Sequence, residues 1–233
     1  MRNLVLAALI AGTSLAGCTT DTEVTVGWNF THLETNAVRS CPTGFATAAV
    51  VAQPVNTSNH RGFGTTIVTL FDCADGQGKI SLPDDIYLVW VEIENDSGSS
   101  QYAQSEAHYI DTLDGDQAFD VEILDDGGYF FLTWDLVDAT TNAPLSCREA
   151  GADGSGFVET ISTAMASPTD IVTDKFTCDD HYGTTDPLLA GNYVVSITAV
   201  RNNAALGDPQ NVQRSIQAPN KLTDLGNIII PID

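Results

Sequence analysis

Three aspartates in one short segment are the residues of this chain best suited to bind a metal ion. Asp111, Asp114 and Asp116 stand close together, and the acidic run continues without a basic residue through Asp120, Glu122, Asp125 and Asp126. Hard cations such as calcium take about six to eight oxygen ligands from acidic loops of this kind. We therefore predict calcium binding at the first three aspartates as one possibility. A solvated acidic loop, which is common on protein surfaces, is the alternative. No other cofactor is predicted.

The four histidines do not indicate an active site. His32, His60, His108 and His181 are scattered along the chain, each in or near a predicted loop. A hydrolytic triad needs a nucleophile, a base and an orienting acid together. The sequence has no Gly-x-Ser-x-Gly elbow, HExxH helix or glycine-rich phosphate loop. We predict a protein without catalytic activity, and an enzyme with an unfamiliar site is the alternative.

The first residues have the organisation of a secretory signal. Arg2 precedes an apolar run over residues 4–10, and small residues then lead to Cys18. The apolar run is too short to cross a bilayer, which takes about 20 residues. The sequence LAGC at 15–18 resembles the bacterial lipobox, in which the peptide is cut before a cysteine that carries a lipid. This resemblance implies a signal peptide over 1–17 and lipid attachment at Cys18. An ordinary signal peptide with a chance cysteine is the alternative.

A short tether would follow the lipid. Residues 18–22 comprise the lipidated cysteine and a tether of four residues before the first predicted strand, so the first part of the fold would lie close to a membrane. Thr19 stands where enterobacterial lipoproteins retained in the inner membrane carry an aspartate. By that resemblance we expect an outer-membrane lipoprotein of a bacterial cell envelope, with the membrane as its partner through the anchor.

The remaining four cysteines predict disulfides. Cys41, Cys73, Cys147 and Cys178 form an even set in an exported chain, and four cysteines allow three connectivities. An internal repeat chooses among them, because similar segments recur at a shift of 105 or 106 positions (26–30 at 132–136, Ser40-Cys41 at Ser146-Cys147, 71–73 at 176–178 and 82–87 at 188–193). Each copy then holds one pair, which predicts Cys41–Cys73 and Cys147–Cys178.

Strand patterns dominate both copies. Apolar and polar residues alternate over 24–30 and 119–123, and β-branched and aromatic residues fill 86–93 and 193–200. Further strands are predicted at 46–52, 65–71, 129–137, 157–162 and 228–232. Short strands at this spacing favour an all-β fold of two tandem, disulfide-pinned β-sandwiches. We predict repeat 1 over 23–125 and repeat 2 over 126–233, and one large sandwich with shared strands is the alternative.

Several aromatic residues raise the possibility of sugar binding. Phe130 and Phe131 are adjacent in a predicted strand, so they point to opposite faces and one of them is a candidate for exposure. Trp90 is more suggestive, because it stands beside Glu92 and is replaced by Ser196 in the second copy. Core packing is the interpretation we favour for Trp90, since large aromatic side chains usually supply burial.

The order of Trp, Cys, Phe-x-Cys and Leu-x-x-Gly-x-Tyr resembles the repeats of uncharacterised lipoproteins from myxobacteria and their relatives. The sequence LLAGNY at 188–193 also resembles the turn and strand of transthyretin-like, carboxypeptidase-regulatory-like domains. Copy one departs from that pattern, with Asp85 in place of the glycine. The resemblance implies an Ig-like or transthyretin-like β-sandwich without catalytic residues. By comparison with immunoglobulin domains, Trp28 and Trp134 are expected to pack against the disulfides.

The charge of the chain restricts its partners. Thirty-one acidic residues against nine basic ones give a formal charge of −22, and both copies share the excess. Such a chain is repelled by nucleic acid, so no nucleic-acid partner is predicted. The leading hypothesis is a lipid-anchored envelope module that binds another envelope component or has a structural role. The alternative is a calcium- or glycan-binding surface adhesin. No oligomeric state is predicted.

Overall fold

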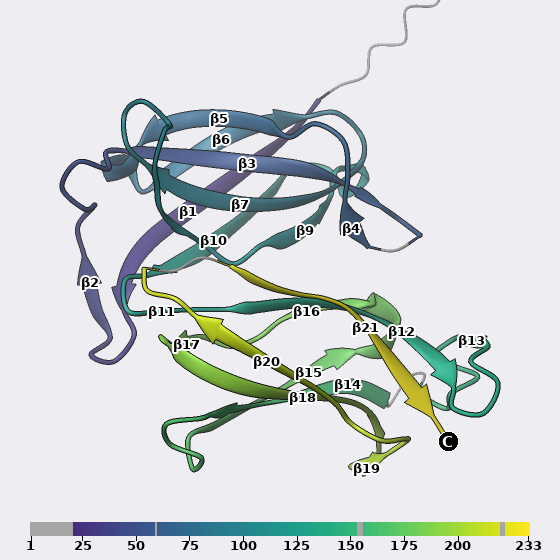
Figure 1. The fold of residues 1–233 in the computed structure, drawn as a ribbon. Helices are drawn as coiled ribbons and strands as arrows, with labels where there is room; N and C mark the ends of the chain where they lie inside the picture. Colours follow the sequence, from purple (N-terminus) through teal and green to yellow (C-terminus); the bar gives the residue numbers. More distant parts are fainter. Residues whose placement is uncertain (1–20, 59, 153–155, 220–221) are drawn as a thin grey trace, which may run out of the picture.

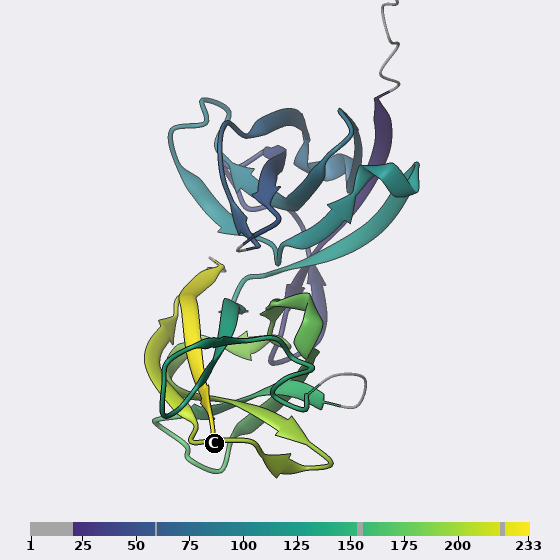
Figure 2. The ribbon, with the colours of Figure 1, turned by 90° about the vertical axis from the view of Figure 1, so that its right-hand side faces the viewer.

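The computed structural model describes residues 21–233 apart from 59, 153–155 and 220–221. Strands make up 61% of the chain and helical turns 4%, so the prediction of an all-β fold is confirmed. Within these residues no helix has the length and apolar character needed to cross a membrane. Two β-sandwiches follow one another along the chain, and Figures 1 and 2 show the second on one end of the first.

The described residues of the first sandwich form ten strands and two short 3-10 turns. Its elements are β1 (Thr22–His32), β2 (Ala37–Arg39), β3 (Thr47–Asn56), β4 (Arg61–Gly62), β5 (Ile67–Asp72), η1 (Cys73–Asp75), β6 (Gln77–Leu82), β7 (Ile86–Glu94), β8 (Gln101–Gln104), β9 (His108–Asp111), η2 (Thr112–Asp114) and β10 (Gln117–Leu124). One sheet has β1 between β10 and β6, with β2 at the end of β1. The other is built on β3 and β7 and includes β4, β5, β8 and β9.

The second sandwich has the same plan. Its elements are β11 (Gly127–Gly128), β12 (Phe130–Asp138), β13 (Pro144–Leu145), β14 (Gly156–Ala164), β15 (Ile171–Thr177), η3 (Cys178–Asp180), β16 (Tyr182–Thr184), β17 (Leu188–Leu189), β18 (Gly191–Arg201), β19 (Ala204–Ala205), β20 (Gln210–Ile216) and β21 (Thr223–Ile232). In each sandwich the first long strand pairs in parallel with the last, β1 with β10 and β12 with β21. No described strand of one sandwich pairs with a strand of the other.

Strand alternation places one face of each sheet in a core. In β1 the side chains of Val24, Val26, Trp28 and Phe30 are buried, whereas Glu23 and Asn29 are exposed. In β7 the residues Tyr87, Val89, Val91 and Ile93 enter the same core from the opposite sheet. The second sandwich has a separate core, centred on Trp134 and its neighbours in β12 and β18. Two cores fit two domains of about one hundred residues each.

A third apolar cluster lies where the sandwiches meet. Val55 and Leu88 from the first sandwich pack with Phe131 from the second, and all three are buried. This contact corrects the expectation that Phe130 or Phe131 is exposed. Phe130 enters the core of the second sandwich, as alternation predicts, but the first sandwich covers the opposite face, where Phe131 lies.

Candidate functional site

Each disulfide belongs to a unit that recurs in both sandwiches. Cys41 is bonded to Cys73 and Cys147 to Cys178, each bond lying within one sandwich. The indole Nε1 of Trp28 donates to the Cys73 carbonyl at 2.9 Å, and that of Trp134 donates to the Cys178 carbonyl at 3.1 Å. The expected proximity of tryptophan and disulfide is thus present twice, with a hydrogen bond that the residue pattern alone did not indicate.

The left-handed residue that follows the 3-10 turn, which we call the corner of the repeated unit, differs between the copies. Gly76 follows η1 with φ +66°, and its carbonyl accepts from the Trp28 N–H at 2.9 Å. The equivalent residue after η3 is His181, which keeps the left-handed backbone at φ +60° and accepts from the Trp134 N–H at 3.2 Å. A non-glycine residue costs about 1–2 kcal/mol in this region.

The His181 ring reaches the first sandwich. It stacks on His60 with ring centroids 5.2 Å apart and planes inclined by 10°. Beside this pair Tyr109 stacks on Tyr182 at 3.5 Å, and the Tyr109 hydroxyl donates to the His60 carbonyl. Burial and the neighbouring His181 lower the pKa of His60, and burial raises the pKa of Tyr109. Two pairs of stacked rings thus join the sandwiches.

A charged contact lies on another part of the same interface. Arg61 of β4 forms an ion pair with Asp224 of β21, and it also donates to the Thr133 hydroxyl at 2.9 Å. The Thr133 hydroxyl donates in turn to the Asn227 side chain at 3.1 Å. The side chain of Arg61 thus ties an edge of the first sandwich to two strands of the second.

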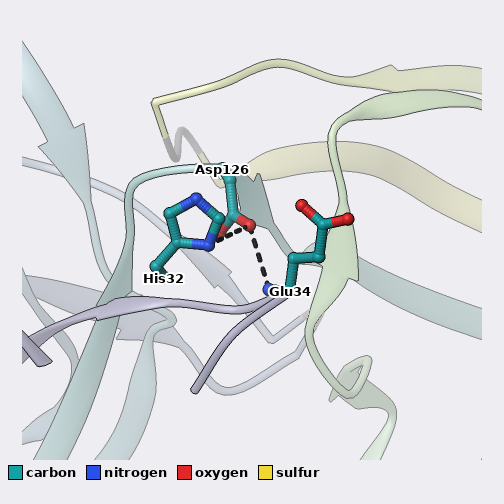
Figure 3. Close-up of side chains that lie close together, drawn as sticks. All are labelled: His32, Glu34 and Asp126. Carbon is teal, nitrogen blue, oxygen red and sulfur yellow. Dashed lines mark hydrogen bonds and ion pairs between the residues drawn. The ribbon is translucent and has the colours of Figure 1, made fainter. Parts of the chain in front are cut away.

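The connection between the sandwiches is held by Asp126. Its two carboxylate oxygens accept from the backbone N–H groups of Leu33 at 2.7 Å and Glu34 at 3.0 Å, and His32 Nδ1 lies 2.9 Å from Oδ2 (Figure 3). Burial alone would raise the pKa of this carboxyl, but the two N–H groups and the charge of His32 together hold the pKa below its usual value. Asp126 therefore fixes the start of repeat 2 to the turn after β1.

The same residues form the one group in the described chain that brings three possible metal ligands within 4.8 Å, namely His32, Glu34 and Asp126. Both oxygens of Asp126 are already occupied by backbone N–H groups, and Glu34 is exposed. A metal would have to compete with these bonds. The arrangement fits a structural joint better than a metal centre.

The predicted calcium ligands have separate roles. Asp111 accepts from the Leu113 N–H at 2.9 Å at the start of η2, whereas Asp116 accepts from the Glu23 N–H at 2.9 Å. Among the described residues, the carboxylate oxygens of Asp111, Asp114 and Asp116 do not all lie within 4.8 Å of one another, in contrast to the ligand atoms of His32, Glu34 and Asp126. Calcium binding at this segment therefore stays a prediction without a preformed three-carboxylate site.

Two of the clefts at the interface of the sandwiches are lined by residues that the sequence had singled out. The larger of these two has a volume of about 410 Å³ and is acidic, because Asp111 of β9 and Asp114 of η2 line it together with Asp179 and Asp180 of η3. The smaller, of about 290 Å³, lies between β7 and β21 and is lined by Trp90. Each cleft takes residues from both sandwiches, so neither could be predicted from one repeat alone.

Trp90 lies outside the core of the first sandwich, which corrects the interpretation that it packs there. Val89 and Val91 point inward, so Trp90 between them points out. It is half-buried at the edge of the interface cluster, and its Nε1 donates to Glu92 Oε1 at 2.7 Å. Ser196, its counterpart in β18, is only partly buried, which explains how the copies differ there without loss of either core.

The four histidines have partners of kinds that do not suggest a catalytic triad. His32 pairs with Asp126, and His108 lies 3.4 Å from a Glu106 oxygen and stacks on Phe119. His60 and His181 stack on one another. The prediction of unconnected loop histidines missed this last pair. No residue pattern connects His60 with His181, because their contact depends on how the two sandwiches pack.

Cys18 and the signal peptide over 1–17 lie outside the described residues, as does most of the tether over 18–22. The described chain begins with Asp21 and β1. Figures 1 and 2 show that β1 starts at the end of the first sandwich that faces away from the second.

No family model matches the sequence, and no curated protein matches it. Solved structures with some similarity include a leucine-rich repeat protein from Bacteroides thetaiotaomicron, at 13% identity and a TM-score of 0.42, over 91% of this chain and 26% of that one. A minor pilin from Streptococcus agalactiae has 11% identity and a TM-score of 0.29, over 91% of this chain and 96% of the pilin. A fimbrial anchor protein from Porphyromonas gingivalis has 12% identity and a TM-score of 0.29, over 76% and 77%.

This chain spans about a quarter of the first of these structures and about a third of another, a protein from Bacillus anthracis. Similarity at this level assigns no function. The resemblance to myxobacterial lipoproteins has no counterpart among the matches.

Proposed function

We propose that this chain is a lipid-anchored, two-domain module of the bacterial cell envelope that has a structural or binding role and no catalytic activity. The observation that carries the proposal is the joint between the sandwiches. An apolar cluster, stacked rings, the Arg61–Asp224 ion pair and the Asp126 bonds all act on one interface. Contacts at several separate points restrict rotation more than a linker alone would.

The direction of the chain supports a spacer. β1 starts at the far end of the first sandwich, and the second sandwich lies at the opposite end (Figure 1). With a lipid at Cys18, the first sandwich would lie next to the membrane and the second would project from it. Such a module would hold the surface of the second sandwich at a fixed height, in an outer membrane if Thr19 has its expected effect.

Solution scattering tests the rigid joint. We expect the scattering profile of the wild type to fit a single arrangement of the two sandwiches. The double variant Arg61→Ala/Asp126→Ala removes two of the fixed contacts and should increase the radius of gyration, while circular dichroism stays that of a folded β protein. Equal profiles for wild type and variant, or a wild type that needs many arrangements, would contradict the rigid joint.

Membrane fractionation tests the anchor. Cys18→Ser should move the protein from the membrane to the soluble fraction and abolish the incorporation of labelled fatty acid. Cys41→Ser is the control, because it removes a different sulfur and should still be lipidated. A Cys18→Ser protein that stays with the membrane and takes up fatty acid would refute the proposed anchor.

A second candidate function is that of a surface adhesin that binds a glycan or calcium. The specific observation in its favour is the pair of interface clefts, one with a half-buried tryptophan and one with four carboxylates.

A further inference from the structure

The smaller interface cleft combines an aromatic surface with polar side chains from both sandwiches. Its walls include Gln53, Arg61, Trp90, Gln104, Phe131 and Asp224. The volume of about 290 Å³ is at the lower end of the range of small-molecule sites, about 300–1,000 Å³. This size suits one ring of a ligand whose remainder stays in solvent.

The aromatic wall has a defined orientation. Trp28 and Trp134 are 3% and 1% exposed and belong to the two cores, whereas Trp90 is half-buried on an outward face. The hydrogen bond from its Nε1 to Glu92 Oε1, 2.7 Å long, directs the polar edge of the indole toward that carboxylate. A ring with its polar edge satisfied in this way can offer its apolar face to a ligand.

The polar wall consists of side chains with paired donors and acceptors. Gln53 and Gln104 each carry an amide with a carbonyl oxygen and an NH₂ group. Gly62 in β4 leaves room for the first of these amides, because a Cβ there would lie 2.2 Å from Gln53 Oε1. Arg61 and Asp224 are paired with each other, so the cleft holds a charge pair and not an isolated charge.

We propose that this cleft binds one sugar residue of a neutral glycan, with a face of the sugar ring against Trp90 and its hydroxyl groups hydrogen-bonded to the amides of Gln53 and Gln104. A sugar ring presents apolar C–H groups on its face and hydroxyl groups at its edge, which matches the two kinds of wall.

Other classes of ligand fit less well. A purely apolar ligand would cover the amides and the ion pair without replacing their hydrogen bonds to water, which is costly. An anionic ligand would meet the field of a chain with a formal charge of −22. Hydrolysis of a glycan needs two carboxyl groups about 5–9.5 Å apart on either side of the bond. In the described lining Asp224 is the one carboxylate, and Arg61 holds it. The cleft is therefore suited to binding without cleavage.

The test uses the full chain in a detergent without a sugar headgroup, and an array of neutral oligosaccharides built from glucose, galactose, mannose and N-acetylglucosamine. We expect binding to at least one of them. Calorimetry with that glycan should show affinity reduced about tenfold or more in Trp90→Ser, which places in β7 the residue that β18 carries at Ser196. Phe157→Ser removes an exposed aromatic residue of β14 and is the matched control, with unchanged affinity.

Trp90 packs against the interface cluster, so Trp90→Ser could weaken binding by altering the interface. A second variant distinguishes this effect from the loss of a contact with the sugar. Gln53→Ala leaves the indole in place and should also weaken binding, and acrylamide quenching of its tryptophan fluorescence should match the wild type without glycan. In the wild type the glycan should reduce quenching, because Trp90 is the accessible tryptophan among the three.

Absence of binding to every oligosaccharide on the array would overturn the proposal. So would binding that both Trp90→Ser and Gln53→Ala leave unchanged. The proposal extends the binding role of the module but does not depend on the lipid anchor. Fractionation of Cys18→Ser and glycan binding by the cleft can therefore fail separately.

Discussion

At the residue scale, the two copies are most similar where a tryptophan, a phenylalanine and a cysteine meet. The Trp28 ring lies 6.0 Å from Phe71, and the Trp134 ring lies 5.8 Å from Phe176. A buried indole N–H without an acceptor would cost about 1–3 kcal/mol. The carbonyl of the second cysteine in each copy supplies that acceptor. The disulfide thus holds in place the backbone that the tryptophan needs.

The left-handed corner of this unit gives a first prediction. Gly76→Ala should lower the free energy of unfolding by about 1–2 kcal/mol, because alanine is strained at φ +66° although its Cβ would meet only the Trp28 carbonyl oxygen at 3.7 Å. In the second copy His181→Gly should be more stable than His181→Ala by a similar amount, since both variants lack the ring and differ only in backbone freedom. Urea unfolding at neutral pH measures both differences. An alanine variant at 181 as stable as the glycine variant would show that the corner is not strained.

The sequence indicated much of this unit and missed part of it for a physical reason. Alignment of the copies brings Cys41 to Cys147 and Trp28 to Trp134, which was sufficient to propose the disulfide pairs. The same alignment brings Gly76 to His181. A histidine in place of glycine at one position does not reveal a ring partner in another domain, since that depends on how the sandwiches pack.

At the element scale, most of the long strands were predictable from the sequence, whereas two edge strands of the second sandwich were not. The alternation in β1 and the apolar runs in β7 and β18 appear in the sequence because one face or both faces of these strands are buried. β15 and β20 were missed. They lie at sheet edges with few buried residues, and charged or amide side chains interrupt their apolar residues, whereas the equally exposed edge strand β5 keeps a run of β-branched and aromatic residues.

The disulfides join elements that pairing alone leaves loosely connected. Cys73 is the first residue of η1 and Cys178 is the first residue of η3. Their partners lie in loops, Cys41 before β3 and Cys147 before β14. Cys41→Ala/Cys73→Ala releases a loop closed over 32 residues, which should lower the free energy of unfolding by about 3–4 kcal/mol.

The other bridge is the matched comparison. Cys147→Ala/Cys178→Ala opens a loop of 31 residues and should have an effect of similar size. Thermal unfolding of the two variants and the wild type measures both losses. If either double variant melts at the temperature of the wild type, that bridge does not stabilise its domain.

At the scale of the whole molecule, the interface decides what the surfaces can do, and it was not predictable from either copy. The residue pattern of each repeat predicts the core of its own sandwich. It does not predict which outer face of one sandwich is covered by the other. Alternation alone therefore leaves one of Phe130 and Phe131 as a candidate for exposure and favours core packing for Trp90. In the structure the first sandwich covers Phe131, and Trp90 lies outside the core at the edge of the interface cluster.

The stacked histidines predict that the stability of the protein depends on pH. The folded-state pKa of His60 is below its usual value of 6.5 because burial and His181 disfavour the charged ring, although Asp135 and Asp180 oppose the shift. The unfolded chain then binds the proton first as the pH falls. The stability from this group is complete above about pH 6.5 and is lost as the pH falls from there through the folded-state pKa.

Thermal melts between pH 7.5 and pH 5 should therefore show a falling melting temperature for the wild type. His60→Asn should show a smaller fall over the same range, because asparagine tolerates the left-handed backbone at this position, φ +55°, and does not titrate. Equal slopes for the two proteins would mean that His60 does not contribute to the pH dependence.

The acidic cleft gives the last prediction, which concerns calcium. The carboxylates of η2 and η3 face one another across the interface, so salts that screen them should stabilise the assembled pair of sandwiches. Because Asp111, Asp114 and Asp116 do not converge, we expect calcium chloride and sodium chloride at equal ionic strength to raise the melting temperature equally.

A bound ion at one hundred times its dissociation constant would add about 2.7 kcal/mol to the free energy of unfolding, which is readily measured. A rise specific to calcium that Asp114→Asn/Asp179→Asn removes would place the ion between the sandwiches, with ligands from both. A rise that this variant keeps but Asp116→Asn removes would return the site to the single loop that the sequence suggested.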